Sequence, residues 1–142
     1  MKRFILVLAL LQYIPITLAI EIKCPDKVNS VEFYANPPAG WITYKRQGLA
    51  VQQKSETPGI FRSVSPHDGS PFEVLGDLIP DNDGSREKQG FWLWNLKGLT
   101  SVYAGCEYTG TNVILIKKIE GEIISSCRVA VTGKKRNQLS CR

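Results

Sequence analysis

Apolar side chains recur in short runs along this chain, and their alternation within these runs predicts β-strands. The most apolar stretch beyond the first twenty residues, Gly90–Leu96, places Trp92 and Trp94 on one face of an extended strand and Phe91 and Leu93 on the other. A strand that is apolar on both faces is typical of the middle of a sandwich or barrel. At least one of these tryptophans is therefore expected in the core.

Twelve glycines and eight prolines separate the apolar runs, and this punctuation is typical of all-β proteins with many short strands. Loops rich in Pro, Asn, Asp and Gly are predicted at Asn36–Gly40, Ser65–Pro71 and Pro80–Gly84, and only Ser85–Gln89 could form a short helix or turn. The predicted strands are Lys27–Tyr34, Trp41–Lys45, Leu49–Gln53, Ile60–Val64, Phe72–Leu75, Gly90–Leu96, Thr100–Tyr108, Asn112–Ile119, Glu122–Val131 and Gln138–Arg142.

The last third of the chain gives the clearest topology. Gly110 and Gly121 separate three predicted strands, which we interpret as an antiparallel meander followed by a fourth returning strand. The predicted fold class is therefore all-β, with a single-domain antiparallel sandwich or barrel formed by residues 20–142 and a C-terminal meander within it.

Residues 1–19 have the pattern of a secretory signal peptide. A basic start precedes the apolar run Phe4–Leu11, and the small residues Thr17 and Ala19 make an acceptable cleavage site. The run is far shorter than the ~20 residues that span a bilayer, and no later segment is apolar enough to do so. We therefore predict cleavage near Ala19 and a periplasmic location for residues 20–142.

Charge adds little to this picture. The formal net charge of +5 falls to +3 when Lys2 and Arg3 leave with the leader, and in an exported chain this does not indicate nucleic acid as a partner. A basic tip at Lys134–Arg136 is interpreted as a solvated edge that blocks strand addition. The alternative is a landing patch for an acidic protein or an anionic envelope polymer.

Four cysteines in an exported chain predict two disulfides. A metal site is excluded by spacing, since there is no C-x-x-C and His67 is the only histidine. If tight turns join the three strands of the meander, Cys106 and Cys127 flank the middle strand about 9.6 Å apart, beyond the ~7 Å that a disulfide tolerates. Cys127 then faces Cys141 in the final hairpin, and the favoured pairing is Cys127–Cys141 with Cys24–Cys106.

No catalytic or cofactor-binding motif is present, and no enzyme activity, metal or cofactor is expected. His67 adjoins Asp68 in the predicted loop, but a triad needs partners that converge in space, and G-x-S-x-G is absent. The acidic stretch Asp81–Glu87 fails both anchoring positions of a calcium loop. Nothing in the sequence brings two carboxylates together as a glycosidase would need.

A set of scaffold residues is shared with known proteins, namely Cys24-Pro25, Pro71 with Leu78 and Pro80, Trp94, Cys106 with Tyr108, Cys127 and Cys141. Over nearly the whole mature chain this set resembles an uncharacterised family of small exported proteobacterial proteins. Members of that family occur beside type VI secretion genes. The resemblance implies a periplasmic immunity protein whose protein partner is a cell-wall-active enzyme or toxin.

We therefore expect an inhibitory binding protein that contacts its partner through predicted loops. The expected contact residues lie in or beside those loops, and Trp41 is presented by a proline-rich one. They are Trp41, Tyr44, Arg62, His67 and Asp68.

Two alternatives remain open. The tripeptide Pro66-His67-Asp68 is similar to the loop that one class of periplasmic lysozyme inhibitors inserts into the enzyme cleft, although the flanking cysteines of that class are missing here. A structural protein that binds the envelope through its basic edge, with no enzyme partner, is the second alternative.

Overall fold

The structure is a computed structural model that describes residues 19–29, 36–45, 58–71, 75–81, 90–121 and 124–142. In these ranges every regular element is a β-strand, and every strand pair is antiparallel. The predicted all-β class is therefore confirmed. No helix among the described residues is long and apolar enough to cross a bilayer.

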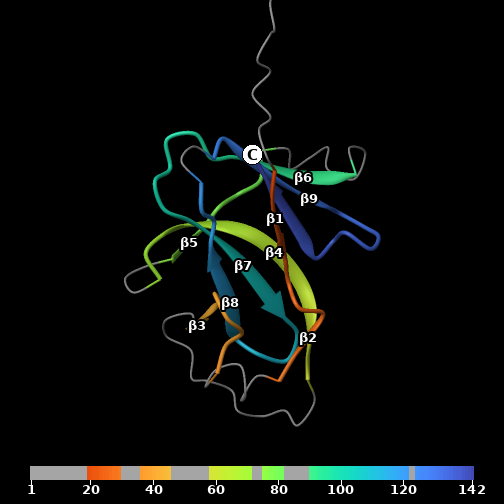
Figure 1. Cartoon of the computed structure of the whole chain (residues 1–142). Coiled ribbons are helices and arrows are strands. Elements are labelled where there is room, and N and C mark those ends of the chain that lie inside the picture. Colours follow the sequence, from red (N-terminus) through yellow and green to blue (C-terminus); the bar gives the residue numbers. More distant parts are fainter. Residues whose placement is uncertain (1–18, 30–35, 46–57, 72–74, 82–89, 122–123) are drawn as a thin grey trace, which may run out of the picture.

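Two sheets face each other. The first has four strands in the order β1-β10-β9-β6, and its members are β1 (Ile20–Lys23), β6 (Phe91–Asn95), β9 (Ser126–Ala130) and β10 (Gln138–Cys141). The second has the order β2-β4-β7-β8-β3, and β5 also pairs with β4. Its members are β2 (Lys27–Val28), β3 (Ile42–Lys45), β4 (Gly59–Gly69), β5 (Leu75–Asp77), β7 (Val102–Tyr108) and β8 (Val113–Lys118). Figure 1 shows β6 and β9 above the long, curved β4, with β7 and β8 below it.

The main core lies between the two sheets. Ile22, Trp94 and Leu139 from the first sheet belong to one buried cluster with Phe61 and Leu115 from the second. Successive side chains of a strand alternate between its faces, so the neighbours of Leu115 on β8 point away from this core. Ile114 and Ile116 accordingly form a second, smaller cluster with Leu75, against which Tyr44 and Tyr103 pack.

The disulfide pairing expected from the sequence is confirmed. Cys24 is joined to Cys106 with their Cα atoms 5.8 Å apart, and Cys127 to Cys141 with Cα atoms 4.1 Å apart. Cys127 and Cys141 are direct cross-strand partners of β9 and β10. Cys24 lies between β1 of the first sheet and β2 of the second, so its bond to β7 fixes the crossover between the sheets.

The predicted three-strand meander is wrong in its third strand. β7 and β8 form a hairpin, in which Cys106 faces Leu115, one position from the expected register. β8 then pairs with β3, whereas β9 pairs with β6 and β10 in the other sheet. After β8 the chain crosses to the first sheet, where Val129 of β9 packs into the core between the sheets. Cys106 and Cys127 are therefore kept apart by lying in different sheets.

Two other expectations need correction. β6 is an edge strand of the first sheet and not a central one, although Trp94 is buried as expected. The segment Ser65–Pro71 is not a loop, because β4 continues to Gly69. The strand Leu49–Gln53, the turn Ser85–Gln89 and the leader up to residue 18 fall outside the described residues.

Tyr108, at the end of β7, makes an edge-on contact with Phe61, with ring centroids 6.3 Å apart. Burial, and secondarily the negative charge of Asp26, raise the pKa of the Tyr108 phenol well above its ordinary value. The folded state therefore keeps the proton when the unfolded chain releases it near pH 10. This contribution to stability is fully present below pH 10 and is lost as the pH rises further.

We predict that Tyr108→Phe reduces the alkaline loss of stability. Between pH 10 and pH 11 the unfolded phenol goes from half to almost fully ionised while the folded phenol stays protonated, which costs the fold about 1 kcal/mol. Phenylalanine removes that cost. Urea unfolding of both proteins at pH 8, 10 and 11 measures the difference. Equal losses in the wild type and the variant would contradict the prediction.

Candidate functional site

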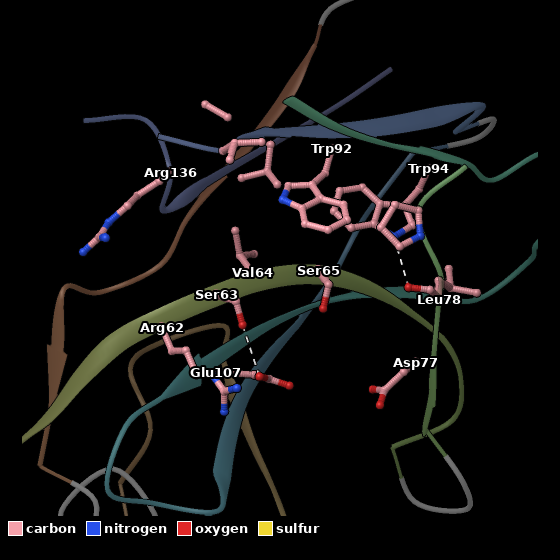
Figure 2. A pocket seen from close by; sticks show the side chains of 14 residues that line it. Arg62, Ser63, Val64, Ser65, Asp77, Leu78, Trp92, Trp94, Glu107 and Arg136 are labelled. Atoms are coloured by element: carbon pink, nitrogen blue, oxygen red, sulfur yellow. Dashed lines mark hydrogen bonds between the residues drawn. The ribbon is translucent and has the colours of Figure 1, made fainter. Parts of the chain in front are cut away.

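A groove of about 410 Å³ opens beside β4, where the two sheets meet. Figure 2 shows Trp92 and Trp94 of β6 on one side of β4, and Ser63, Ser65 and Glu107 on the other. The groove therefore wraps around the edge of one strand, from the space between the sheets to the outer face of the second sheet.

The groove exists because the outer edge of β4 is only partly paired. One edge of β4 pairs with β7 from Phe61 to Asp68. On the other edge, β2 reaches only Gly59 and Ile60, and β5 begins only at His67. The Phe61 N–H donates to the Asp26 carbonyl at 2.9 Å, so among the described residues no backbone pairing covers positions 62–66 of that edge, a length of about 17 Å at the usual rise per residue.

The alternation of backbone hydrogen bonds along β4 identifies which of its backbone groups face the gap between β2 and β5. The Gly69 N–H donates to the Ser101 carbonyl at 3.1 Å, on the side of β7. In an antiparallel pair alternate residues bond to the same neighbour, so Ser65 is directed to β7 and Val64 to the gap. Pro66 also faces the gap, where its missing N–H costs no sheet hydrogen bond.

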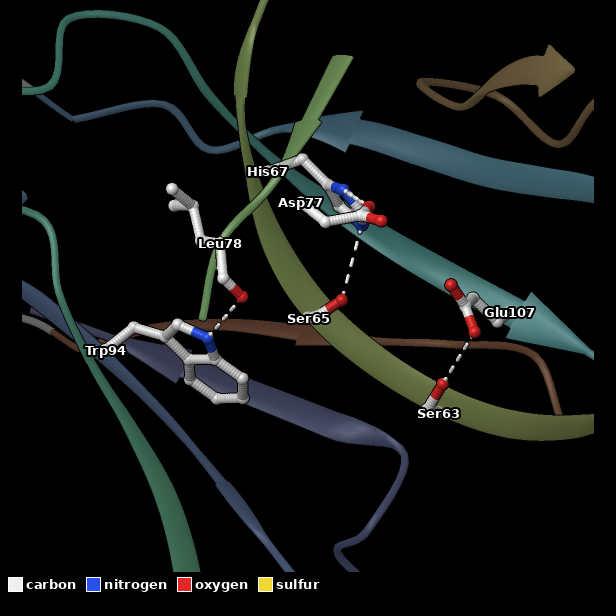
Figure 3. Close-up of polar contacts among 7 residues, drawn as sticks. All are labelled: Ser63, Ser65, His67, Asp77, Leu78, Trp94 and Glu107. Carbon is white, nitrogen blue, oxygen red and sulfur yellow. Dashed lines mark hydrogen bonds and ion pairs between the residues drawn. The ribbon is translucent and has the colours of Figure 1, made fainter. Parts of the chain in front are cut away.

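A line of polar side chains forms the outer wall of the groove (Figure 3). Ser63 Oγ donates to Glu107 Oε2 at 3.1 Å. Ser65 Oγ lies 3.3 Å from His67 Nε2, and His67 Nδ1 lies 2.9 Å from Asp77 Oδ1. This relay of contacts joins β4 to β5, and the tautomer of the His67 ring sets whether Nε2 donates to or accepts from the Ser65 hydroxyl.

The imidazole of His67 rests over Gly105, its near neighbour on β7. A Cβ atom at Gly105 would lie 2.2 Å from His67 Nε2, so only glycine leaves room for the ring. The side chain of His67 is 1% exposed. The histidine is therefore a buried element of the sheet.

The relay Ser65–His67–Asp77 has the connectivity of a hydrolase triad but lacks local donors for an oxyanion. In serine hydrolases such donors include the backbone N–H of the nucleophile or of the residue after it. Here the Ser65 N–H is directed into the β4–β7 pairing, and the following residue, Pro66, has no N–H. We interpret the relay as a structural contact between two strands.

The inner wall of the groove is aromatic. The rings of Trp92 and Trp94 stack with centroids 6.5 Å apart and an interplanar angle of 24°. Trp94 is buried, and its Nε1 donates to the Leu78 carbonyl at 3.1 Å. Trp92 is half-buried and lines the groove. A rigid aromatic surface of this kind is what binding pockets use to hold apolar groups.

Two guanidinium groups lie at one end of the groove and Asp77 lies at the other (Figure 2). Arg62 is exposed on β4, and Arg136 is exposed in the turn before β10. The guanidinium carbon of Arg136 lies 6.0 Å from the centre of the Phe61 ring, a cation–π distance. Within the described part of the chain, the one contact of a basic side chain with a carboxylate at ion-pair distance is that of His67 with Asp77, so neither arginine is paired with a carboxylate there.

The residues predicted from the sequence do not form one site. Trp41 and Tyr44 lie at β3, and Arg62 lies on β4, with β7 and β8 between these two strands. Trp41 is half-buried against the core, with Lys117 Nζ 5.8 Å from the centre of its ring. Tyr44 is half-buried in the second cluster. Of the predicted contact residues, only Arg62 lines the groove.

His67 and Asp68 are not loop residues, and this part of the expectation is wrong. Both belong to β4 and are paired on both sides, His67 with Tyr103 and Asp77. Asp68 is half-buried, and its Oδ1 accepts from the Gly69 N–H at 2.9 Å. A tripeptide held inside a sheet cannot enter an enzyme cleft as the lysozyme-inhibitor loop does, so that alternative is dropped.

Sequence reasoning missed most of the groove, in particular Ser63, Ser65, Trp92, Glu107 and Arg136. The signal that could have found them is Pro66. The predicted strand ends at Val64 and the predicted loop Ser65–Pro71 contains this proline, but proline is tolerated on an unpaired edge. A strand that continues through it places Ser63 and Ser65 on one face.

No group of three or more potential metal ligands occurs among the residues that the structure describes. Fold and groove together define a disulfide-linked β protein with a cavity at a strand edge that no other described strand covers. Residues 52–142 match the model of a protein family described as Type VI secretion system Tli immunity protein. The match covers more than half of the chain, and the chain belongs to this family. No curated protein and no solved structure matches it.

Proposed function

We propose that this chain is an exported inhibitor that binds a type VI toxin in the periplasm and obstructs it, and that the toxin attacks peptidoglycan. Membership of the Tli immunity protein family carries this proposal, since an immunity protein protects a cell from a toxin. The resemblance found in the sequence supports peptidoglycan as the target of the toxin.

The proposed location rests on two observations. Cys24–Cys106 and Cys127–Cys141 are both bonded, and disulfides persist in oxidising compartments such as the bacterial periplasm. The predicted leader is the second support, because β1 begins at Ile20, directly after the expected cleavage site. Removal of residues 1–19 would leave both sheets complete.

Inhibition by obstruction requires a rigid surface and no catalyst. A stable inhibitory interface buries about 1,600 Å² in total, with aromatic and arginine side chains near its centre. The groove offers both types of side chain, Trp92 together with Arg62 and Arg136. Trp92 and Arg62 lie on β6 and β4, whose neighbours β9 and β7 each carry a disulfide. This is the surface that we assign to the toxin.

The test uses the type VI toxin of the same strain that this chain is proposed to inhibit, exported to the periplasm of a host that also carries either the full chain or a chain without residues 2–19. We expect the full chain to protect growth and the shortened chain to fail. Two readouts, release of wall fragments and hydrolysis of membrane phospholipid, identify the reaction that is suppressed.

Each outcome bears on a different part of the proposal. Growth arrest despite the full chain would contradict the immunity mechanism, and protection by the shortened chain would contradict the periplasmic location. Suppression of phospholipid hydrolysis, with no release of wall fragments by the toxin alone, would leave the inhibitor role intact and overturn peptidoglycan as the target.

A further inference from the structure

We infer that the toxin inserts an extended segment beside β4, at the unpaired edge between Arg62 and Ser65, and that this segment carries a carboxylate next to an apolar side chain. The inference rests on the proposed function and names the part of the toxin that the groove would bind.

The backbone of β4 favours an extended occupant. Val64 lines the groove and directs its N–H and C=O into the gap between β2 and β5, and Pro66 directs its carbonyl there. A strand laid along this edge could exchange two hydrogen bonds with Val64 and donate a third to Pro66. Addition of a strand to a partly paired sheet edge is a recurrent way of binding a peptide.

The two walls define the side chains of the occupant. Side chains of an added strand alternate between its faces, so one set would meet the indole of Trp92 and the next would meet the polar outer wall. Trp92 is half-buried and stacked on Trp94, which fixes its orientation. An apolar side chain of the toxin would complete the burial of this ring.

The charged side chains of the groove indicate which charge the polar side chain of the toxin segment would carry. The carboxylates of the groove are engaged within the protein, Glu107 by Ser63 and Asp77 by His67. Arg62 and Arg136 line the same groove and form no ion pair with the described residues. A guanidinium fork matches a carboxylate in geometry as well as charge, so this end of the groove suits an aspartate or glutamate of the toxin.

The experiment measures binding of the purified chain, residues 20–142, to the purified toxin with its active site inactivated. Arg62→Glu/Arg136→Glu is expected to weaken binding at least 100-fold, and Trp92→Ala at least 10-fold. The matched control is Lys118→Glu/Arg128→Glu, which changes the net charge equally at two exposed positions outside the groove. This control is expected to bind within 3-fold of the wild type. Melting temperatures identify any variant that fails to fold.

Hydrogen exchange provides a measurement on the unsubstituted protein. Binding is expected to slow exchange of the Val64 amide, whereas the Ser65 amide, already bonded to β7, changes little. A photo-crosslinker in place of Ala130, which lines the groove from β9, leaves both arginines intact and is expected to capture a toxin peptide that contains an acidic residue next to an apolar one.

Wild-type affinity in the arginine variant, an unchanged Val64 amide in the complex, or a crosslinked peptide without an acidic residue would each overturn the inference. All of these results presuppose that the wild type binds the toxin. Absence of wild-type binding would instead refute the proposed function itself.

Discussion

Replacement of Cys24 and Cys106 by alanine is expected to lower the free energy of unfolding by about 4–5 kcal/mol, in the chain-entropy account of disulfide stabilisation. The two cysteines are 82 residues apart in sequence, so their bond restricts a long loop of the unfolded chain. A small domain commonly has about 5–15 kcal/mol of stability in total. The doubly substituted protein should therefore unfold at a much lower urea concentration.

The second disulfide supplies the internal control for this result. Cys127 and Cys141 are 14 residues apart, and their replacement by alanine is expected to cost about 3 kcal/mol by the same account. Urea unfolding at pH 7 measures both variants. An equal or larger loss for the Cys127/Cys141 variant would contradict the loop-length explanation.

Gly105→Ala is expected to destabilise the fold by about 2–3 kcal/mol, because the new methyl group collides with the imidazole of His67. The imidazole can move aside only by giving up its contacts with Ser65 and Asp77. In a protein that already carries His67→Ala, the same glycine substitution should cost less than about 1 kcal/mol. The two substitutions are therefore expected to be strongly non-additive.

Thermal or urea unfolding of the two single variants and the double variant measures this coupling. Gly76→Ala is the matched control, since a methyl group there would meet only the Asp68 carbonyl at 3.5 Å, an ordinary contact. Additive losses from Gly105→Ala and His67→Ala would show that the ring is not held over Gly105 in solution.

The disulfide pairing could be predicted from the sequence, although one of its premises was wrong. The register of the last hairpin places Cys127 opposite Cys141, and local turn geometry is enough to see this. Exclusion of Cys106–Cys127 assumed that β9 pairs with β8, whereas β9 belongs to the other sheet. Which sheet β9 joins depends on which side chains complete the core, and the alternation of apolar and polar residues along a strand does not determine this.

The groove could not be predicted from the sequence because it depends on where β4 lacks a neighbouring strand. Ser63 and Ser65 alternate with Val64 in the sequence, which correctly indicates a strand with one polar face. What opens the site is that β2 and β5 leave the middle of β4 uncovered. Strand lengths and sheet order set that gap, and neither follows from local propensity. The burial of His67 likewise depends on Gly105, 38 positions away in the chain.

Cys24 lies outside the segment that the family model matches, which starts at residue 52. A fragment cut at that boundary would lack β1, β2 and β3, and Cys106 would retain a thiol with no partner within the fragment. The outer edge of β10, which β1 covers in the whole chain, would also lie open. Such fragments would tend to join one another through sulfur or through strand edges, so recombinant work on this protein should begin upstream of Cys24.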